Sequence, residues 1–172
     1  ERQMTLIPLG KSITLRQGRH LAILAFGSMV DPCRTVAERL DATLINMRFV
    51  KPLDREAILA AAASHAKLVT VEENALAGGA GSGVNELLAA EGSMAEILNV
   101  GLGDCFLEHA SREECLHLAG LDVDGIMARV VRFTLVVRLG LTTRSKRCRP
   151  SNTGNVWLQT LRSPFGLLDF AV

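Results

Sequence analysis

Two short glycine-containing segments are the first candidates for chemistry, because such segments can hold phosphate groups with backbone N–H donors. Gly10-Lys11-Ser12 matches the end of a phosphate-binding loop, but Thr5 stands where that loop needs its first glycine, and an apolar run follows the segment instead of preceding it. Residues 79–84 resemble a dinucleotide-binding fingerprint in which Val84 replaces the third required glycine. We expect neither segment to bind a nucleotide. The second is interpreted as a tight loop at the start of a helix, whose dipole would attract an anion.

Acidic, histidine and cysteine side chains form no recognisable catalytic or metal-binding set. Glu72 and Glu73 are adjacent, so in an extended chain they point to opposite faces, and we expect one of them to accept backbone hydrogen bonds. The four histidines lack metal-ligand spacing, and His109, five residues after Asp104, is interpreted as a polar interface residue. No cysteines have C-x-x-C spacing, which excludes a recognisable zinc motif and favours free thiols in a reducing cytoplasm. Cys33 lies on an apolar helix face and is predicted to be a core thiol.

Alternating strands and helices must position these residues. The expected strands are residues 13–15, 21–26, 42–45, 67–71 and 95–100. The first two strands flank Gln17-Gly18 and are predicted to form a hairpin. Helices are expected after Asp31, which would be the N-cap with Pro32 at the first helical position, after Asp54, and after a glycine-rich loop at 78–83. A capping box at residues 111–114 predicts a short final helix.

Strands separated by helices of about a dozen residues indicate crossover connections and a mostly parallel sheet. The strands are continuous apolar runs, as burial on both faces of a sheet requires. The predicted fold is therefore α/β, a three-layer αβα domain whose mostly parallel sheet has one antiparallel strand from the opening hairpin.

Composition limits the classes of function. The chain has 172 residues, of which 48% are hydrophobic and 22% charged, so a packed domain is expected. No apolar run approaches the ~18 residues that a membrane span needs, which predicts no membrane partner. Aromatic residues make up 4% and include no Tyr, which argues against nucleic-acid binding by base stacking.

Charge divides the chain into two unlike parts. Residues 1–128 carry 11 basic and 17 acidic side chains, a net charge of −6, whereas residues 129–172 carry 8 and 1, a net charge of +7. The basic part is either a tether for nucleic acid or membrane, or a segment foreign to the domain. The second interpretation is favoured because the helical and strand periodicity ends there. We predict a linker over 1–11, a domain over 12–128 and a non-native or disordered basic tail over 129–172.

Several blocks of this sequence resemble the C-terminal, transketolase C-terminal-like domain of the 1-deoxy-D-xylulose-5-phosphate synthase family. The blocks are residues 24–30, 46–54, 71–82 and 101–112, and they occur in the order and at the spacing of that family. The resemblance covers about residues 5–128, near where the family ends, and is looser to transketolase and to 2-oxoacid dehydrogenase β subunits. Gly103, Cys105 and Ala110 depart from the residues common in the family, which are Pro, a basic residue and Gly.

This resemblance implies a piece of a larger enzyme of bacterial cytoplasm or plastid stroma. The family condenses pyruvate with glyceraldehyde 3-phosphate, releases carbon dioxide, and gives 1-deoxyxylulose 5-phosphate for isoprenoid and thiamine synthesis. Its chemistry belongs to thiamine diphosphate, held through Mg²⁺ by a Gly-Asp-Gly…Asn motif in the earlier domains. Gly103-Asp104-Cys105 does not match that motif. The resemblance thus implies no catalytic, cofactor-binding or metal-binding residue in this chain, and no activity of the chain alone.

What the resemblance implies is an accessory, dimer-supporting domain that docks on the preceding domain and on a dimer partner. The candidate interface residues are Arg48, Lys51, Asp54, Glu72, Glu73, Gly78, Gly79, Gly81, Ser82, Asp104 and His109. One alternative is the equivalent domain of transketolase or of a 2-oxoacid dehydrogenase β subunit, docking an acyltransferase core in the latter case. A more remote alternative is a nucleic-acid binder that works through the basic tail.

Overall fold

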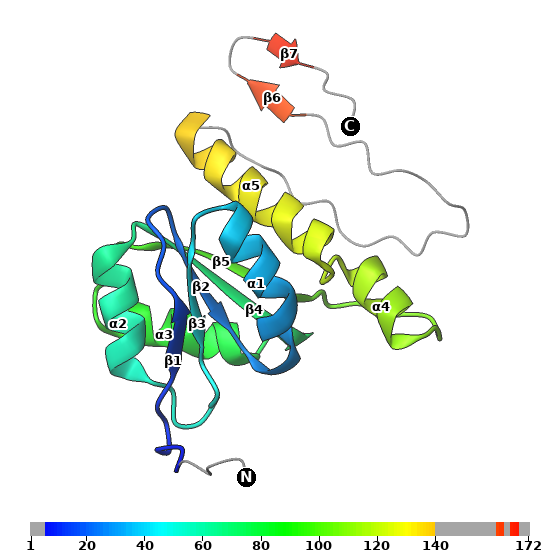
Figure 1. Ribbon diagram of the computed structural model, residues 1–172. Helices are drawn as coiled ribbons and strands as arrows, with labels where there is room; N and C mark the ends of the chain where they lie inside the picture. Colours follow the sequence, from blue (N-terminus) through cyan, green and yellow to red (C-terminus); the bar gives the residue numbers. More distant parts are fainter. Residues whose placement is uncertain (1–5, 140–160, 164–165, 169–172) are drawn as a thin grey trace.

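A computed structural model describes residues 6–139, 161–163 and 166–168. The body of the chain is a five-stranded sheet covered by helices (Figure 1). Its strands are β1 (Ile13–Arg16), β2 (Ala22–Ala25), β3 (Thr43–Asn46), β4 (Lys67–Ala75) and β5 (Glu96–Leu102), in the spatial order β1-β3-β2-β4-β5. β1 runs antiparallel to β3 and the other pairs are parallel, so the predicted αβα fold with one antiparallel strand is confirmed. The short strands β6 (Leu161–Ser163) and β7 (Gly166–Leu168) pair with each other.

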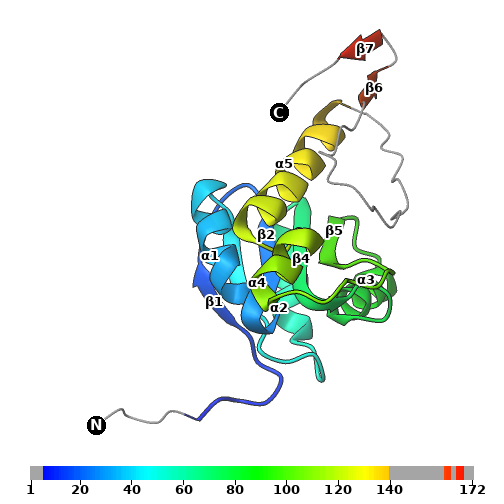
Figure 2. The same ribbon diagram turned by 90° about the vertical axis from the view of Figure 1, so that its right-hand side faces the viewer.

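Helices form a layer on each face of the sheet (Figure 2). One layer contains α1 (Val30–Arg39), which follows a 3-10 turn η1 (Gly27–Met29), and α5 (Val123–Leu139). The other layer contains α2 (Arg55–Ser64) and α3 (Ala80–Ala90). α4 (Arg112–Ala119) lies to the side of the sheet and has no buried residue. None of the helices in the described ranges is long and apolar enough to cross a membrane.

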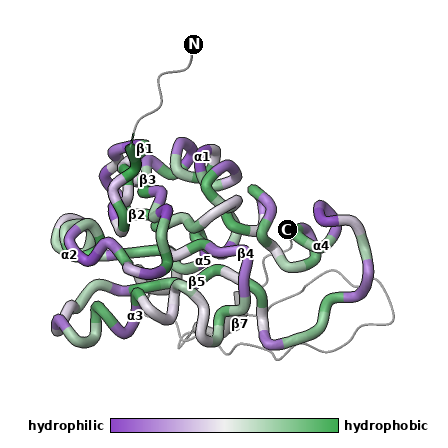
Figure 3. Tube along the Cα trace, turned by 90° about the horizontal axis from the view of Figure 1, so that it is seen from below, coloured by the Kyte–Doolittle hydropathy of each residue, from purple (hydrophilic) through white to green (hydrophobic). Residues whose placement is uncertain are grey.

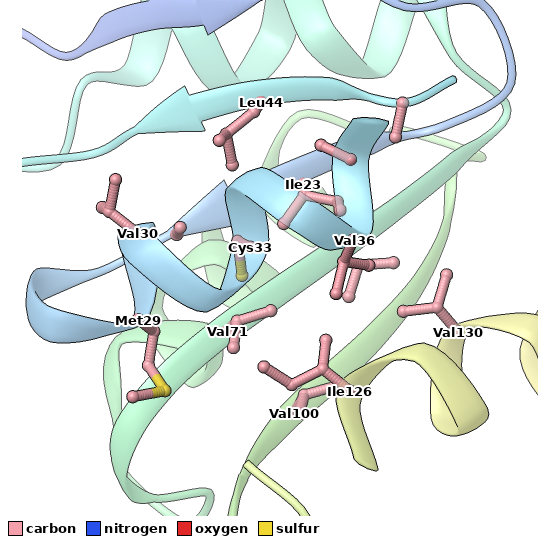
Figure 4. Packing of buried hydrophobic residues seen from close by; sticks show 14 of the residues in the cluster. Ile23, Met29, Val30, Cys33, Val36, Leu44, Val71, Val100, Ile126 and Val130 are labelled. Atoms are coloured by element: carbon pink, nitrogen blue, oxygen red, sulfur yellow. The ribbon is translucent and has the colours of Figure 1, made fainter. Parts of the chain in front are cut away.

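The core has two parts, one on each face of the sheet. In the first part, Cys33 of α1 and Ile126 of α5 lie next to Val71 of β4, and Val130 of α5 faces Val36 of α1 (Figure 4). All five side chains are fully buried. The second part lies between the sheet and the layer of α2 and α3. Cys33 is therefore a core thiol, as predicted, and burial raises its pKa to about 12.

Strand β2 contributes to both parts of the core, because successive side chains of a strand point to opposite faces. Ile23 and Ala25 pack under α1 and α5, while Ala22 and Leu24 pack on the side of α2 and α3. This double burial is the physical reason for the continuous apolar run in the sequence.

The predicted hairpin of the first two strands is wrong, because β1 pairs with β3 and not with β2. Gly18 lies directly against the backbone of Ala42, where a side chain would collide with the carbonyl group. Beyond it, the N–H groups of Arg19 and His20 donate to the carbonyl oxygen of Asp41, at 2.8 and 3.3 Å. The connection therefore crosses the start of β3, and β1 becomes the edge strand.

The starts of two helices also differ from prediction. α1 begins at Val30, after η1, so Asp31 is not its N-cap and Pro32 is not at its first position. Pro32 still lies in the first turn, where its missing N–H has no helical partner to lose. α3 begins at Ala80, so only the first part of the expected loop at 78–83 is non-helical. The predicted caps of α2 by Asp54 and of α4 by Ser111 are confirmed.

The short final helix that was expected, α4, is followed by the longer α5. α5 runs through residue 128, where the charge changes sign, and Val130 beyond that point is part of the core. The guanidinium of Arg129 donates to the carbonyl oxygen of Ala119 at 2.7 Å. The first part of the basic segment therefore packs and bonds within the folded domain. The basic run at 144–149 lies outside the described residues.

Candidate functional site: a polar edge of the sheet

The carboxyl ends of the parallel strands meet at one edge of the sheet, where open α/β sheets carry their functional surfaces. We call residues 26–29, 46–54, 72–82 and 103–111, which follow or end β2 to β5, the carboxyl edge. Figure 3 shows the tube changing from hydrophobic to hydrophilic along β4. In this strand, apolar residues are followed by Glu72, Glu73 and Asn74. All eleven predicted interface residues lie in these four segments.

An open hollow of about 340 Å³ lies on the carboxyl edge between the ends of β2 and β4 and the start of α3. Its lining residues are Phe26, Gly27, Ser28, Val50, Glu72, Glu73, Asn74, Gly78, Gly79 and Ala80. Both glutamates of this lining are engaged by other groups of the chain, as the following contacts show.

Glu72 is almost fully buried, with 3% of its surface exposed, and its carboxylate caps α3. Oε2 accepts a hydrogen bond from the Ala80 N–H at 2.7 Å, and Oε1 accepts one from the Gly81 N–H at 2.8 Å. These N–H groups belong to the first turn, the positive end of the helix dipole. Glu72 is therefore the glutamate that accepts backbone hydrogen bonds, and its carboxylate occupies the place that an external anion would take.

Glycines beside Glu72 permit this close contact. A Cβ atom at Gly79 would lie 2.5 Å from a carboxylate oxygen of Glu72, and one at Gly81 would lie 2.6 Å from the Thr70 hydroxyl. Neither distance leaves room for a methyl group. The glycines that resemble a nucleotide-binding fingerprint thus make room for the carboxylate of Glu72.

Ser82 closes the loop that leads into α3. Its hydroxyl accepts a hydrogen bond from the Gly78 N–H at 3.1 Å and donates one to the Leu76 carbonyl oxygen at 2.8 Å. Gly78 has a φ of 73°, in the left-handed region that favours glycine. Internal contacts therefore fix the shape of this part of the carboxyl edge.

Glu73 points away from Glu72 and connects three elements. Its carboxylate accepts hydrogen bonds from the Ser28 hydroxyl of η1 and from Arg112 of α4, whose Nε lies at 3.1 Å and Nη2 at 2.5 Å. The Arg112 guanidinium and the Ser28 hydroxyl together hold the pKa of Glu73 below its usual range. Glu73 is thus an ionised anchor between β4, η1 and α4.

Asp54 has the corresponding role at the start of α2. Its carboxylate accepts hydrogen bonds from the backbone N–H and the hydroxyl of Ser12, at 2.7 and 2.9 Å, and from the Ala57 N–H at 3.3 Å. Burial alone would raise the pKa of Asp54, but these hydrogen bonds and the charge of Lys11 outweigh burial and lower it. Gly10-Lys11-Ser12 therefore also holds a carboxylate of this chain, in place of the phosphate that its pattern suggests.

Arg48 and Lys51 project from the loop between β3 and α2. Both are exposed, and their side chains form no ion pair with the described residues. Arg48 adopts a left-handed φ of 58°, and its N–H donates to the Asn46 side chain at 3.0 Å. Val50, between the two cations, has 51% of its surface exposed. This loop therefore presents two positive charges and an apolar side chain to its surroundings.

Residues 103–119, the loop after β5 together with α4, form a projection that we call the arm. Asp104 and His109 are exposed on its loop, and Phe106 is fully exposed. α4 begins with a complete capping box between Ser111 and Glu114, so its start is well defined. Phe106 was not among the predicted interface residues. Its sequence signal was a large aromatic residue in a loop between the charged residues Asp104 and Glu108.

Comparison with known proteins identifies the family. The chain matches the family described as the transketolase C-terminal domain over residues 10–126, and it belongs to that family. It is 61% identical over 128 residues to the 1-deoxy-D-xylulose-5-phosphate synthase of Chromohalobacter salexigens, and 54% identical over 130 residues to that of Nitrosococcus oceani. The alignments cover 73% and 76% of this chain but 20% of each relative, so the chain spans about a fifth of their length.

A solved structure agrees with this assignment. A split-gene transketolase, determined as an inactive β4 tetramer, superimposes with a TM-score of 0.68 at 30% sequence identity. The superposition covers 73% of this chain and 43% of the other. The resemblance found in the sequence and the fold that it implied are both confirmed.

Proposed function

We propose that this chain is the C-terminal domain of a 1-deoxy-D-xylulose-5-phosphate synthase and acts as an accessory domain. Its carboxyl edge would dock on the preceding domain of the same enzyme and on a dimer partner. The complete enzyme would join pyruvate to glyceraldehyde 3-phosphate with loss of carbon dioxide, for isoprenoid and thiamine synthesis. The observation that carries this proposal is the 61% identity over 128 residues to a synthase of which the alignment covers 20%. This identity also favours the synthase over a transketolase or a dehydrogenase β subunit.

The direction in which the chain enters the sheet supports docking at the carboxyl edge. Asp54 holds Ser12 beside the start of α2, and Ile13 of the antiparallel β1 pairs with Asn46, the last residue of β3. Residues that precede this point therefore reach the body at the carboxyl edge (Figure 1). Leu6 and Leu9 are largely exposed there, with 94% and 74% of their surfaces uncovered. A preceding domain would be positioned to cover them.

Thiamine diphosphate and Mg²⁺ do not fit the residues that the structure describes. The N–H donors at the start of α3, which could hold a phosphate group, already bind Glu72. Asp104 is exposed on the arm, and the described ranges contain no group of three or more His, Cys, Asp or Glu side chains placed to hold a metal ion. The cofactor would thus be bound by the domains that lie outside this chain, and the chain alone would be inactive.

Replacement of the equivalent domain in a relative tests this proposal. The Chromohalobacter salexigens synthase would be expressed with its last fifth removed, and again with this chain fused in its place. We expect the shortened enzyme to be inactive and the fusion to release carbon dioxide from pyruvate when glyceraldehyde 3-phosphate is present. A well-folded fusion with no activity would contradict the proposal. So would micromolar binding of thiamine diphosphate and Mg²⁺ to the isolated chain in a calorimetric titration.

Location and nucleic-acid binding are separate questions. The relatives named above are bacterial, and we place this chain in the cytoplasm on that ground. The nucleic-acid alternative depends on the basic run at 144–149, which lies outside the described residues. Such binding would weaken steeply as salt is added. If deletion of residues 140–172 leaves the binding unchanged, this alternative is wrong.

A further inference from the structure

The arm is attached to the body by polar contacts at both ends of α4. α4 itself has no buried residue, and its first residue, Arg112, pairs with Glu73. Its last residue is followed by Gly120, which has a left-handed φ of 64°, and then by Leu121, which is almost fully buried. α5 begins two residues later (Figure 1). Leu121 is therefore the fixed point about which the arm can change its direction relative to α5.

A histidine and an aspartate connect the end of α4 to the start of α5. Nδ1 of His117 lies 2.7 Å from Oδ2 of Asp122, while Oδ1 of Asp122 accepts a hydrogen bond from the Gly125 N–H at 2.8 Å. Asp122 is thus the N-cap of α5, and its second oxygen holds α4. Helix dipoles favour both charges, because a cation is stabilised in the last turn of a helix and an anion before the first turn.

Two glycines let the two helices approach each other closely at this junction. A Cβ atom at Gly125 would lie 2.6 Å from the Cα atom of Gly120 and 2.7 Å from Oδ1 of Asp122. His117 lies at the surface, with 76% of its side chain exposed. The pair of His117 and Asp122 therefore closes the junction on the side that faces solvent, where protons reach the ring freely.

We propose that His117 and Asp122 form a proton-dependent latch, which holds the arm against α5 while His117 is protonated and loosens it when His117 is neutral. The protonated ring attracts the carboxylate by its charge. The neutral ring lacks this charge, and it donates to Asp122 only when its remaining proton is on Nδ1. The attachment at the other end of α4 does not change, because Glu73 and Arg112 each stabilise the charged form of the other, which lowers the pKa of Glu73 and raises that of Arg112.

The acidic groups closest to His117 favour its protonated form. The hydrogen bond to Asp122, the charge of Asp122 and the charge of Asp124 together raise the pKa of His117 above its usual value. Burial alone would raise the pKa of Asp122, but the hydrogen bonds from His117 and Gly125 outweigh burial and lower it. Each partner thus stabilises the charged form of the other.

Charged side chains from three helices surround this pair. They are Glu113 and Glu114 of α4, Arg129 of α5, which donates to the carbonyl group of the last residue of α4 at 2.7 Å, and Arg39 of α1, which lies 3.9 Å from Asp124. Histidine is the residue type in this group that changes charge near neutral pH. Protonation of His117 is therefore the event that alters the charge balance of the junction in that range.

His117 stabilises the closed latch on the acid side of neutrality. Because the pKa of His117 is higher in the folded chain, its contribution is complete below the unfolded value of 6.5 and is lost as the pH rises through the folded pKa. Asp122 keeps its charge over this range, since its own pKa is lowered by the hydrogen bonds described above. The arm should thus be held more firmly in mild acid than in mild alkali.

Hydrogen exchange of the full chain at about pH 5.5 and about pH 8 tests the latch, after correction for the direct effect of pH on amide exchange. We expect α4 to be about two- to fivefold better protected at the lower pH, since an exposed ion pair is a weak interaction. Protection of α1 should be the same at both pH values. Equal protection of α4 at the two pH values would overturn the proposal. So would an equal fall in both helices, because the whole domain would then respond.

Substitution of each partner gives the sharper test. His117→Gln removes the titrating ring, so protection of α4 should be low and the same at both pH values. Asp122→Asn keeps a cap for α5, because asparagine is a good N-cap residue, but it removes the charge that attracts the protonated ring. In this variant, NMR should show the titration midpoint of His117 moving down toward its usual value. An unchanged midpoint would overturn the proposal.

A second histidine on the arm provides the matched control. His109 is exposed on the loop of the same arm, and His109→Gln should keep the parent's difference in α4 protection between the two pH values. If this variant lost the difference as completely as His117→Gln, the latch would be refuted. Circular dichroism of each variant would establish that it folds. The latch concerns the chain by itself, so its failure would leave the fusion experiment above unaffected, and the reverse also holds.

Discussion

An ion pair between Glu73 and Arg112 joins the end of β4 to the first turn of α4, across 39 positions of sequence. The same carboxylate accepts the Ser28 hydroxyl, so one side chain holds η1, β4 and the arm together. α4 has no buried residue, and Leu116 is only partly covered by the core. The placement of the arm beside the hollow therefore depends in part on Glu73.

Replacing Glu73 by Gln should loosen the arm while the sheet stays intact. The amide keeps the shape of the side chain but loses the charge that attracts Arg112. Since a partly exposed ion pair is a weak interaction, we expect amide exchange in α4 to rise only about two- to fivefold, with exchange in α1 unchanged. Hydrogen exchange with mass spectrometry measures both helices at once. Glu86→Gln on the exposed side of α3 is the control, and an equal effect there would refute a specific role of Glu73.

Loss of the Glu72 carboxylate should destabilise the whole domain. Glu72→Ala leaves the N–H groups of Ala80 and Gly81 without acceptors in a buried place. We expect a loss of about 2–4 kcal/mol in the free energy of unfolding, measured by urea denaturation. Glu72→Gln retains one acceptor oxygen and should fall between the parent and the alanine variant. The exposed Glu86→Ala should change stability by less than about 0.5 kcal/mol.

Glycines of the same segment should respond differently to alanine. Gly79→Ala would force a methyl group against the Ala75 carbonyl oxygen and the Glu72 carboxylate, and we expect a loss of about 2 kcal/mol or more. Gly83 lies inside α3, where alanine has the better helix propensity, and its Cβ would meet only the end of the Leu53 side chain at 3.3 Å. Gly83→Ala should therefore be neutral or stabilising by up to about 1 kcal/mol. Equal losses in both variants would argue against the contact with Glu72.

Local signals explain which features could be read from the sequence. The caps at Asp54 and Ser111 were predictable because a cap bonds to N–H groups two or three residues away. The opposite orientation of Glu72 and Glu73 follows from the alternation of a strand. Burial of Cys33 follows from helical spacing. Each of these depends on neighbours in the chain, so a single sequence contains the information.

Contacts between distant segments explain the features that were missed. β1 pairs with β3 because Gly18 fits against Ala42, a contact that no local pattern shows. α5 was overlooked because the net charge changes sign at residue 128, yet Val130 is buried and Arg129 bonds to the Ala119 carbonyl group. Counting charges does not distinguish a basic side chain that stabilises the fold from one that binds a ligand.

Acid should weaken the attachment of the entering segment at Asp54. The pKa of Asp54 is lower in the folded chain than in the unfolded chain, because hydrogen bonds from Ser12 and Ala57 outweigh burial. Its carboxylate therefore stabilises the fold above the unfolded pKa, and this contribution is lost as the pH falls through the folded pKa. The difference in stability between the parent chain and Asp54→Asn should accordingly be larger at neutral than at acid pH.

Urea denaturation of the two proteins at about pH 6 and about pH 3, on either side of the usual aspartate pKa, measures this difference. Asp31→Asn is the control, since Asp31 is exposed in the first turn of α1 and lies 3.6 Å from Arg34. Its effect should be small at both pH values, because exposed ion pairs contribute little. A difference between parent and Asp54→Asn that is the same at both pH values would mean that Asp54 is not ionised where it caps α2.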